Sequence, residues 1–205
     1  ARPPAEVFRD LSAVEIPETL DTPVEVSQAA RWRSAAPREF RFCMKASHMT
    51  PEGWGATRAV AEALGAAAIV FETPADFGPT EANRTAIYRF FESIETDVVK
   101  AIELRGRWAT HIVERICEDL NLVHAVDPFE NEPATYGLAY FRIPGTGPDG
   151  SIGRSYADDD LARLRRVCAE YDDAYVLFGN ETMHSDARRF QKLVGGSDFG
   201  AAFVG

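Results

Sequence analysis

The sequence predicts an α/β fold, a (β/α) TIM-like barrel that is incomplete because only seven strands are found. Three observations lead to this prediction. Short apolar runs of strand length alternate with amphipathic helical patterns along the chain. The segments between most successive strands are long enough for the crossover that parallel strands require. Nearly every predicted strand also ends in a polar or charged residue, and in a parallel barrel these ends meet at one face, where active sites lie.

The first half of the chain supplies four predicted strands and three predicted helices. The strands are Leu11–Ile16, Phe40–Lys45, Ala66–Phe71 and Val98–Leu104, and the helices are Pro23–Ala35, Trp54–Leu64 and Thr80–Ile94. A capping box with proline at the first helical position begins the first helix at Thr22–Glu25, and Gly65 ends the second. The third helix has the clearest amphipathic pattern, with apolar residues spaced i, i+3, i+4 and i+7 from Ile87.

The second half supplies three more strands and three more helices. The strands are Asn121–Val126, Thr135–Ile143 and Ala174–Phe178, and the helices are Trp108–Leu120, Leu161–Tyr171 and Ser185–Val194. With seven strands, Leu11–Ile16 and Ala174–Phe178 would form two unpaired edges of the barrel. No internal boundary is visible in the sequence, so we expect a single domain over residues 1–205.

The composition narrows the class of protein and its partners. The formal net charge is −10, and such an acidic surface disfavours non-specific nucleic-acid binding, which depends on neutralising phosphates. We expect no membrane association, because no apolar run approaches about 20 residues and no charged-then-apolar leader is found. Cys43, Cys117 and Cys168 lie in apolar stretches, which indicates buried free thiols and a cytoplasmic location. The sequence does not indicate an oligomeric state.

Charged and polar side chains gather at the predicted strand ends. They are Glu15, Lys45, Glu72, Glu103 with Arg105, Asp127, Arg142 and Asn180. Any one of these residues could be a solvated loop charge, but this does not explain a polar residue at the end of seven successive strands. Charges at buried strand ends cost stability unless they are paired or take part in function. Glu103 and Arg105 are two residues apart, so their side chains leave the strand on the same side. Three cations and four carboxylates suit an anionic or polyhydroxylated ligand, and carboxylates can move protons or hold a divalent metal.

Histidine is the other candidate for acid/base chemistry. His48 lies in the loop after Lys45, so we place it among the candidate residues. The other histidines, His111, His124 and His184, are interpreted as structural. The sequence contains no Gly-x-Gly-x-x-Gly, P-loop, nucleophile-elbow or Cys/His metal motif, so no motif identifies a cofactor.

Several stretches, in order along the chain, carry a resemblance to a known family. They are Val14–Ile16, Arg31–Arg33, Ala36–Pro37, Phe40–Ala46, Phe71–Pro74, Phe77, Glu103–Arg105, Trp108, Asp127–Phe129, Tyr140–Arg142, Tyr156, Tyr175–Asn180 and Asp186–Ala187. On these residues the chain resembles the domain of unknown function 72 family, and more closely its shorter, archaeal-type branch. The resemblance implies a TIM-barrel-like fold and adds Tyr156 to the candidate ligand contacts. It implies no known reaction, because the family is named for lacking one.

The chain also departs from the pattern of that family. Thr50-Pro51 stands where the family has threonine-histidine, Pro144-Gly145 where it has histidine-glycine, and Gly179-Asn180 where it has two asparagines. We expect the first strand of the family, with its glycine-rich end, to be missing before Ala1. These departures keep a non-catalytic role open beside a catalytic one.

Two hypotheses of function follow. The first is an enzyme that acts on a small or polymeric anionic substrate, such as a phosphate ester that it hydrolyses, by acid/base or metal-assisted chemistry at the C-terminal mouth of the barrel. Its candidate catalytic residues are Glu15, Lys45, Glu72, Glu103 and Asp127, and its candidate substrate contacts are His48, Arg105, Arg142, Tyr156 and Asn180. A divalent metal is the cofactor that the carboxylates suggest. The second hypothesis is a binding or assembly module that uses the barrel as a scaffold.

Overall fold

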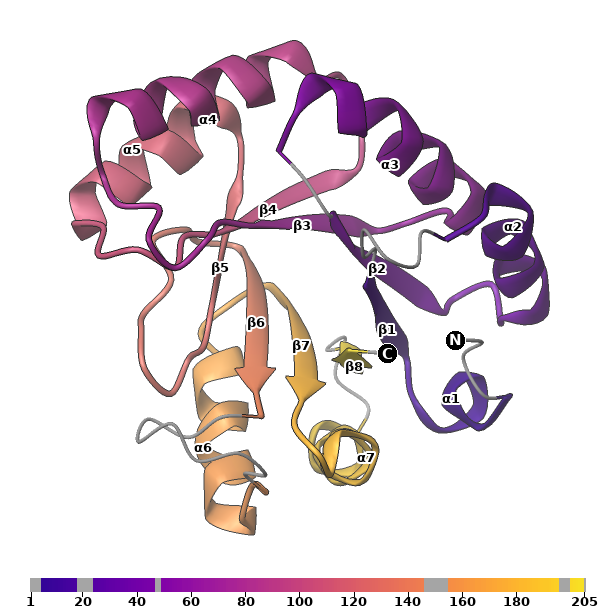
Figure 1. Ribbon diagram of the computed structural model, residues 1–205. Helices are drawn as coiled ribbons and strands as arrows, with labels where there is room; N and C mark the ends of the chain where they lie inside the picture. Colours follow the sequence, from indigo (N-terminus) through magenta and orange to yellow (C-terminus); the bar gives the residue numbers. More distant parts are fainter. Residues whose placement is uncertain (1–4, 18–23, 47–48, 146–154, 196–199, 205) are drawn as a thin grey trace.

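Eight parallel strands form a closed barrel in the computed structural model, which describes residues 5–17, 24–46, 49–145, 155–195 and 200–204 (Figure 1). The strands are β1 (Ala13–Pro17), β2 (Arg41–Ala46), β3 (Ala68–Glu72), β4 (Val99–Glu103), β5 (Val123–Val126), β6 (Leu138–Pro144), β7 (Asp173–Gly179) and β8 (Gly200–Val204). Each strand pairs in parallel with the next, and β8 pairs with β1. The α/β class and the TIM-like barrel are therefore as predicted.

The strand count of seven is corrected to eight. All seven predicted strands are present, but β8 lies between β7 and β1, with Tyr175 opposite Gly200 and Ala13 opposite Ala202. The expected unpaired edges at β1 and β7 are consequently filled within the described sheet. Gly-Ala-Ala-Phe-Val was not recognised as a strand because it is short and rich in small residues with weak strand preference.

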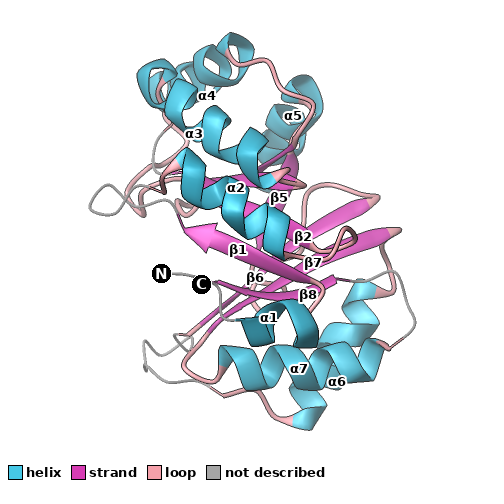
Figure 2. Cartoon of the chain, turned by 90° about the vertical axis from the view of Figure 1, so that its right-hand side faces the viewer, coloured by secondary structure: helices cyan, strands magenta, loops and turns pink. Residues whose placement is uncertain are grey.

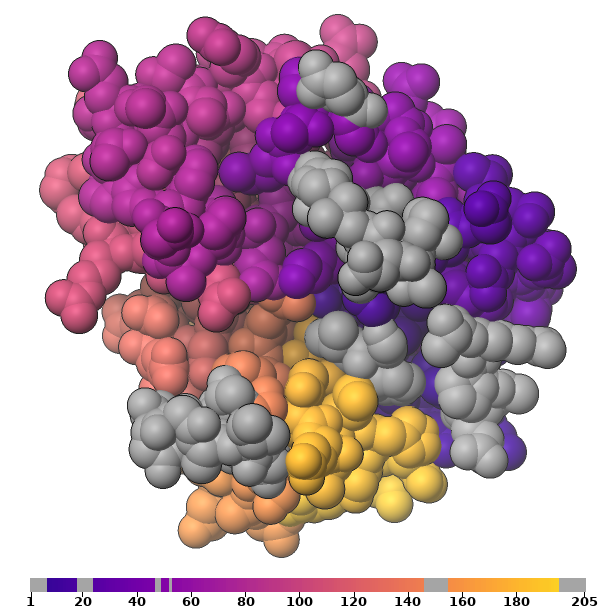
Figure 3. Space-filling view, viewed as in Figure 1, coloured from indigo at the N-terminus to yellow at the C-terminus, as the bar shows by residue number. Residues whose placement is uncertain are grey.

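The helices lie outside the ring of strands. They are α1 (Ala5–Asp10), α2 (Val26–Ala35), α3 (Pro51–Leu64), α4 (Glu81–Ser93), α5 (Thr110–Leu120), α6 (Asp158–Cys168) and α7 (Met183–Val194). Figure 2 shows the strands between α2 to α5 on one side and α1, α6 and α7 on the other. In the space-filling view, the orange and yellow C-terminal elements pack directly against one another below the magenta central ones (Figure 3). No helix in the described part of the chain is long and apolar enough to cross a membrane.

Local signals set several helix ends. The Thr80 hydroxyl caps α4 by accepting the Asn83 N–H at 3.2 Å, and Gly65 ends α3 in the left-handed region at φ 59°. The expected capping box at Thr22–Glu25 lies largely outside the described residues, and Glu25 precedes α2 without a side-chain cap bond. The short helix α1 was not predicted.

The connection between β5 and β6 contains no helix, although residues 127–137 are described throughout. Every other pair of consecutive strands is separated by a helix. This flank of the barrel is therefore covered by a loop, and that difference shapes the cleft described below.

Two layers of apolar side chains form the core. The outer faces of the strands pack against the helices, and Phe42, Phe71 and Phe141 are fully buried there. A second cluster, of smaller residues and two tyrosines, lines the barrel interior: Ala13, Cys43, Ala68, Val70, Ala101, Ala125, Tyr140, Tyr175 and Leu177. Cys43, Cys117 and Cys168 are buried free thiols, as predicted.

Strand alternation determines which side chains reach the mouth. Side chains two positions apart on a strand share a face, so the residue two positions beyond each interior residue also points inward. Within five strands that residue is charged: Glu15, Lys45, Glu72, Glu103 and Arg142. These are the C-terminal ends of β1, β2, β3, β4 and β6, so the fold brings these side chains to one opening.

Candidate functional site

Glu72 lies at the centre of the charged cluster at the mouth. Its Oε2 atom lies 2.6 Å from Lys45 Nζ and 2.9 Å from a terminal nitrogen of Arg142, and its Oε1 atom lies 3.1 Å from Arg105. Burial alone would raise the pKa of Glu72, but the hydrogen bonds and charges of Lys45 and Arg142 outweigh it and lower this pKa to about 2. Glu72 is therefore ionised at any physiological pH.

Arg142 joins the three glutamates of the mouth. One terminal nitrogen binds both Glu72 and Glu103, and the other donates to Glu15 at 2.9 Å. Burial works against its charge, but the carboxylates of Glu15 and Glu103 raise the pKa of Arg142 above its usual range. The guanidinium is thus permanently charged and fixed by three carboxylates.

Glu15 lies below Arg142, inside the barrel. It has no exposed surface, and its second oxygen accepts the Tyr140 hydroxyl at 2.8 Å. Burial raises the pKa of Glu15 above its ordinary value, although Arg142 and the Tyr140 hydrogen bond favour the ionised form. Tyr140 was not among the predicted site residues. Its position two residues before Arg142, on the same strand face, is the signal that could have identified it.

The cluster is graded from the barrel interior to solvent. The exposed fraction of the side chain is 0% for Glu15, 16% for Arg142, 17% for Glu72, 24% for Glu103, 31% for Lys45 and 50% for Arg105. A ligand at the mouth would therefore meet Arg105, Lys45 and Glu103 first. The backbone N–H of Arg105 donates to the Thr73 hydroxyl at 3.1 Å, which fixes this residue just beyond β4.

Asp127 and Tyr156, two other predicted site residues, lie outside this ion-pair cluster. The Asp127 carboxylate accepts the Phe129 N–H at 2.9 Å and lines the same cleft. The buried Tyr156 ring stacks on Phe129, and its hydroxyl donates to the Pro144 carbonyl at 3.0 Å. These contacts give Tyr156 a place in the packing beneath the mouth. His48 lies outside the described residues.

Asn180 belongs to a second polar cluster, at the start of α7. Its amide donates to Asp186 at 2.7 Å and to Thr182 at 2.8 Å, and the Thr182 hydroxyl donates to Asp186 at 2.7 Å. Arg189 also donates to Asp186, at 2.9 Å. Burial would raise the pKa of Asp186, but these hydrogen bonds lower it below its ordinary value. Asp186 thus ties the end of β7 to α7, a role that sequence reasoning did not assign.

The mouth opens into a cleft of about 1390 Å³. Glu72, Glu103, Arg105 and Arg142 line its mouth end, and the cleft continues along His124, Ala134 and Tyr136 beside the β5–β6 connection. Within the described residues, no group of three or more His, Cys, Asp or Glu side chains is arranged to hold a metal ion.

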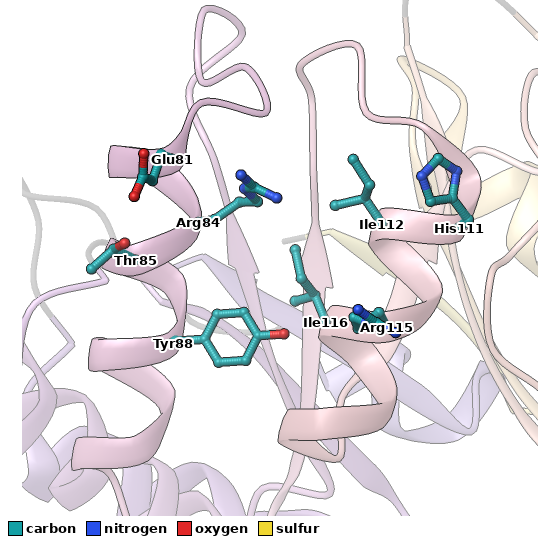
Figure 4. A pocket seen from close by; sticks show the side chains of 8 residues that line it. All are labelled: Glu81, Arg84, Thr85, Tyr88, His111, Ile112, Arg115 and Ile116. Carbon is teal, nitrogen blue, oxygen red and sulfur yellow. The ribbon is translucent and has the colours of Figure 1, made fainter.

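A separate groove of about 690 Å³ lies between α4 and α5 on the outside of the barrel. Figure 4 shows Arg84 and Tyr88 of α4 pointing toward Ile112 and Ile116 of α5. The Tyr88 hydroxyl donates to Asp119 at 2.6 Å, and burial together with this contact raises the pKa of Tyr88 to about 12. The groove contains none of the strand-end residues, so the candidate site is the mouth.

Comparisons with known proteins identify the family but not an activity. The family described as "Protein of unknown function DUF72" matches residues 5–201. The fold is similar to that of a DUF72 family protein (EF0366) from Enterococcus faecalis V583, with a TM-score of 0.75 and 20% identity over 94% of this chain and 93% of that chain. It is also similar to a DUF72 family protein (TM1631) from Thermotoga maritima MSB8, with a TM-score of 0.71 and 17% identity over 89% of this chain and 84% of that chain. No curated protein matches the chain.

Proposed function

The chain belongs to the DUF72 family, and on that premise we propose that it is an enzyme that binds an anionic substrate at the barrel mouth and moves a proton with a glutamate. The observation that carries the proposal is the graded cluster, in which Arg105 and Glu103 line the cleft and the partly exposed Lys45 shares Glu72 with Arg105, above a buried, fixed ion-pair network. Preorganised charges of this kind stabilise charge that develops in a transition state.

Arg105 and Lys45 are the proposed anion contacts. Both are partly exposed, and each is held by Glu72, so neither has to be ordered when a ligand arrives. Arg105 contacts Glu72 through one terminal nitrogen, which leaves other guanidinium N–H groups to form a planar fork for a phosphate or carboxylate. Arg142 is nearly saturated by three carboxylates, so we assign it a positioning role in place of the predicted substrate contact.

Glu103 is the proposed proton acceptor. It is the most exposed of the three glutamates, whereas Glu15 is fully buried and Glu72 stays ionised between its cations. Its contact with Arg142 holds the carboxylate in place. Glu15 and Glu72 then act by fixing Arg142, Lys45 and Arg105, and they do not touch the substrate.

Hydrolysis of a phosphate ester is the reaction that best fits these groups. Lys45 and Arg105 neutralise the phosphate, and Glu103 accepts a proton from water as its oxygen bonds to phosphorus and the ester P–O bond breaks. We assign Lys45 the second role of supplying a proton to the leaving oxygen. General acid/base catalysis of this kind contributes roughly 10²- to 10⁴-fold to rate.

The test combines phosphate binding with turnover of a panel of phosphate mono- and diesters. Arg105→Lys should weaken the binding of inorganic phosphate by roughly 1.5 to 3 kcal/mol, the worth of a hydrogen bond to a charged group, without lowering the melting temperature. Glu103→Gln should lose turnover while keeping phosphate affinity. Arg58→Lys is the matched control, because Arg58 is 54% exposed and pairs with one carboxylate, Glu62, away from the mouth.

Three outcomes separate the hypotheses. A loss of stability in Arg105→Lys with unchanged phosphate affinity would end the case for Arg105 as an anion contact. Failure of inorganic phosphate to bind would overturn the proposal. Phosphate binding without turnover of any ester would support the alternative, a binding module.

We also propose a branch of the family and a cellular location for this chain. We place the chain in the archaeal-type branch on the stretches quoted above, and in the cytoplasm on its three buried free thiols. In a secreted protein, free cysteines would instead be expected to form disulfide bonds.

A further inference from the structure

The cleft is larger than a small anion requires. Ligand sites for small molecules usually enclose about 300 to 1000 Å³, whereas this cleft has about 1390 Å³. Its additional volume lies outside the barrel, between α5 and residues 127–137. Between the other consecutive strands a helix covers the barrel, but between β5 and β6 there is none. We call this part of the cleft the flank arm; it is lined by Val113, Glu114, His124, residues 130–134 and Tyr136.

The wall of the flank arm is fixed by hydrogen bonds. His124 Nδ1 accepts the Ala134 N–H at 3.1 Å, and its own backbone N–H donates to the Thr135 hydroxyl at 3.1 Å. Gly137 follows with φ 80°, a conformation that favours glycine, and its carbonyl accepts the Asp172 N–H at 2.8 Å. Tyr136 therefore sits between two anchored neighbours.

Tyr136 itself is 89% exposed while it lines the cleft. An exposed aromatic ring on a fixed backbone can stack on a flat or ring-shaped group at low cost in conformational entropy. Its position on the flank arm, beyond the ion-pair cluster, places such a group on the far side of the anion site.

The polarity of the flank arm indicates which kind of ring would suit it. Glu114, Glu130, Asn131 and Glu132 supply oxygen acceptors, while the cations that line the cleft are Arg105, Arg107 and Arg142 near the mouth. Carboxylate and amide oxygens accept hydrogen bonds from hydroxyl groups and repel a second anion. The arm thus suits a neutral, hydroxyl-rich group better than the continuing backbone of a nucleic acid.

We propose that the flank arm binds a glycosyl group of the substrate, stacked on Tyr136, while the phosphate of the same substrate lies at Lys45 and Arg105. This proposal rests on the proposed function for its phosphate end. It makes the substrate class a sugar phosphate and makes Tyr136 a specificity-determining residue.

The test compares the affinity of inorganic phosphate with that of four hexose 1-phosphates, those of glucose, galactose, mannose and N-acetylglucosamine, and with phenyl phosphate. At least one hexose phosphate should bind about tenfold more tightly than inorganic phosphate, because stacking adds to the anion contacts. Tyr136→Ala should remove that advantage and leave the affinity for inorganic phosphate unchanged. Tyr136→Phe keeps the ring and should keep the advantage, and the exposure of this side chain means that neither variant should impair folding.

The outcomes distinguish this proposal from the proposed function. Equal affinities for inorganic phosphate and all four hexose phosphates would overturn the glycosyl site while leaving the phosphate site intact. Tighter binding of phenyl phosphate than of every hexose phosphate would also overturn it, in favour of an aryl group. If inorganic phosphate does not bind, the flank arm is tested alone by adding neutral maltotriose and following the NMR chemical shifts of the backbone amides. Shifts of the Tyr136 and His124 amide resonances would support a glycosyl site in the flank arm, and their absence would overturn it.

Discussion

Arg142→Met is the substitution that tests the ion-pair network most directly. Methionine keeps much of the apolar volume of the arginine stem but removes the charge that three glutamates share. Glu15, with no exposed surface, would lose its ion pair and keep the hydrogen bond from the Tyr140 hydroxyl, whereas Glu72 would keep Lys45 and Arg105. Removing one partner of a buried ion pair costs about 3 to 5 kcal/mol, because the remaining charge stays buried.

The free energy of unfolding in urea measures this cost. With a slope of about 2 kcal/mol per M, the midpoint of Arg142→Met should fall by about 1.5 to 2.5 M. Arg105→Met is the matched control. Its side chain is half exposed and binds one carboxylate, so its loss should cost less than about 1 kcal/mol.

A double variant identifies the origin of the loss. Glu15→Gln removes the most buried carboxylate and leaves an oxygen to accept the Tyr140 hydroxyl. Combined with Arg142→Met, it should restore part of the stability, so that the double variant loses about 1 to 3 kcal/mol less than the sum of the single variants. Equal losses in Arg142→Met and Arg105→Met, with additive behaviour in the double variant, would refute the network as drawn.

Two more predictions concern the elements around the mouth. Burial lowers the pKa of His124 to about 4, so between pH 6.5, its ordinary pKa, and pH 4 the unfolded chain binds a proton that the folded chain does not. The free energy of unfolding should therefore fall by about 3 kcal/mol as the pH decreases from 6.5 to 4. His124→Asn should reduce this pH dependence, measured by urea unfolding at a series of pH values. Asp186→Asn should cost about 2 to 3 kcal/mol of unfolding free energy at pH 7, because it removes the charge from the hydrogen bonds with Asn180, Thr182 and Arg189. The difference in stability from the unsubstituted protein should shrink as the pH falls through the lowered pKa of Asp186. An equal loss at pH 7 and pH 3 would contradict the charge-based explanation.

The charged mouth could be predicted from the sequence because it depends on two simple regularities. Parallel strands place their C-terminal ends at one opening, and side chains two positions apart share a face. Glu103 and Arg105 follow both regularities, and the structure places both beside the ion-pair network. Asp127 also lies two positions beyond an interior residue, Ala125, but just outside β5, and its carboxylate accepts the Phe129 N–H. Asn180 obeys the first regularity only, and its amide donates to Asp186 of α7.

Other features depend on contacts that no local pattern encodes. β8 is stabilised by pairing with β7 and β1, although its five residues have little strand preference of their own. The buried bond between Tyr140 and Glu15 joins residues 125 positions apart. The flank arm exists because residues 127–137 form a hydrogen-bonded loop where the alternation of strands and helices predicts a helix.

The composition of the barrel interior bears on whether the mouth cluster serves stability or chemistry. Below the mouth the interior is filled by four alanines, Cys43, Val70, Leu177 and two tyrosines, so a largely apolar filling is compatible with this ring of strands. Replacing a buried ion-pair network by well-packed apolar residues is often neutral or stabilising, so stability alone gives no reason to keep three glutamates, two arginines and a lysine at one opening. Removing one charge of the cluster at a time costs unfolding free energy, yet the fold does not need the cluster as a whole. Its charges are balanced and held by one another. Arg105, the most exposed of them, lines a cleft together with Glu103, which is the arrangement expected when fixed charges bind and react with a ligand.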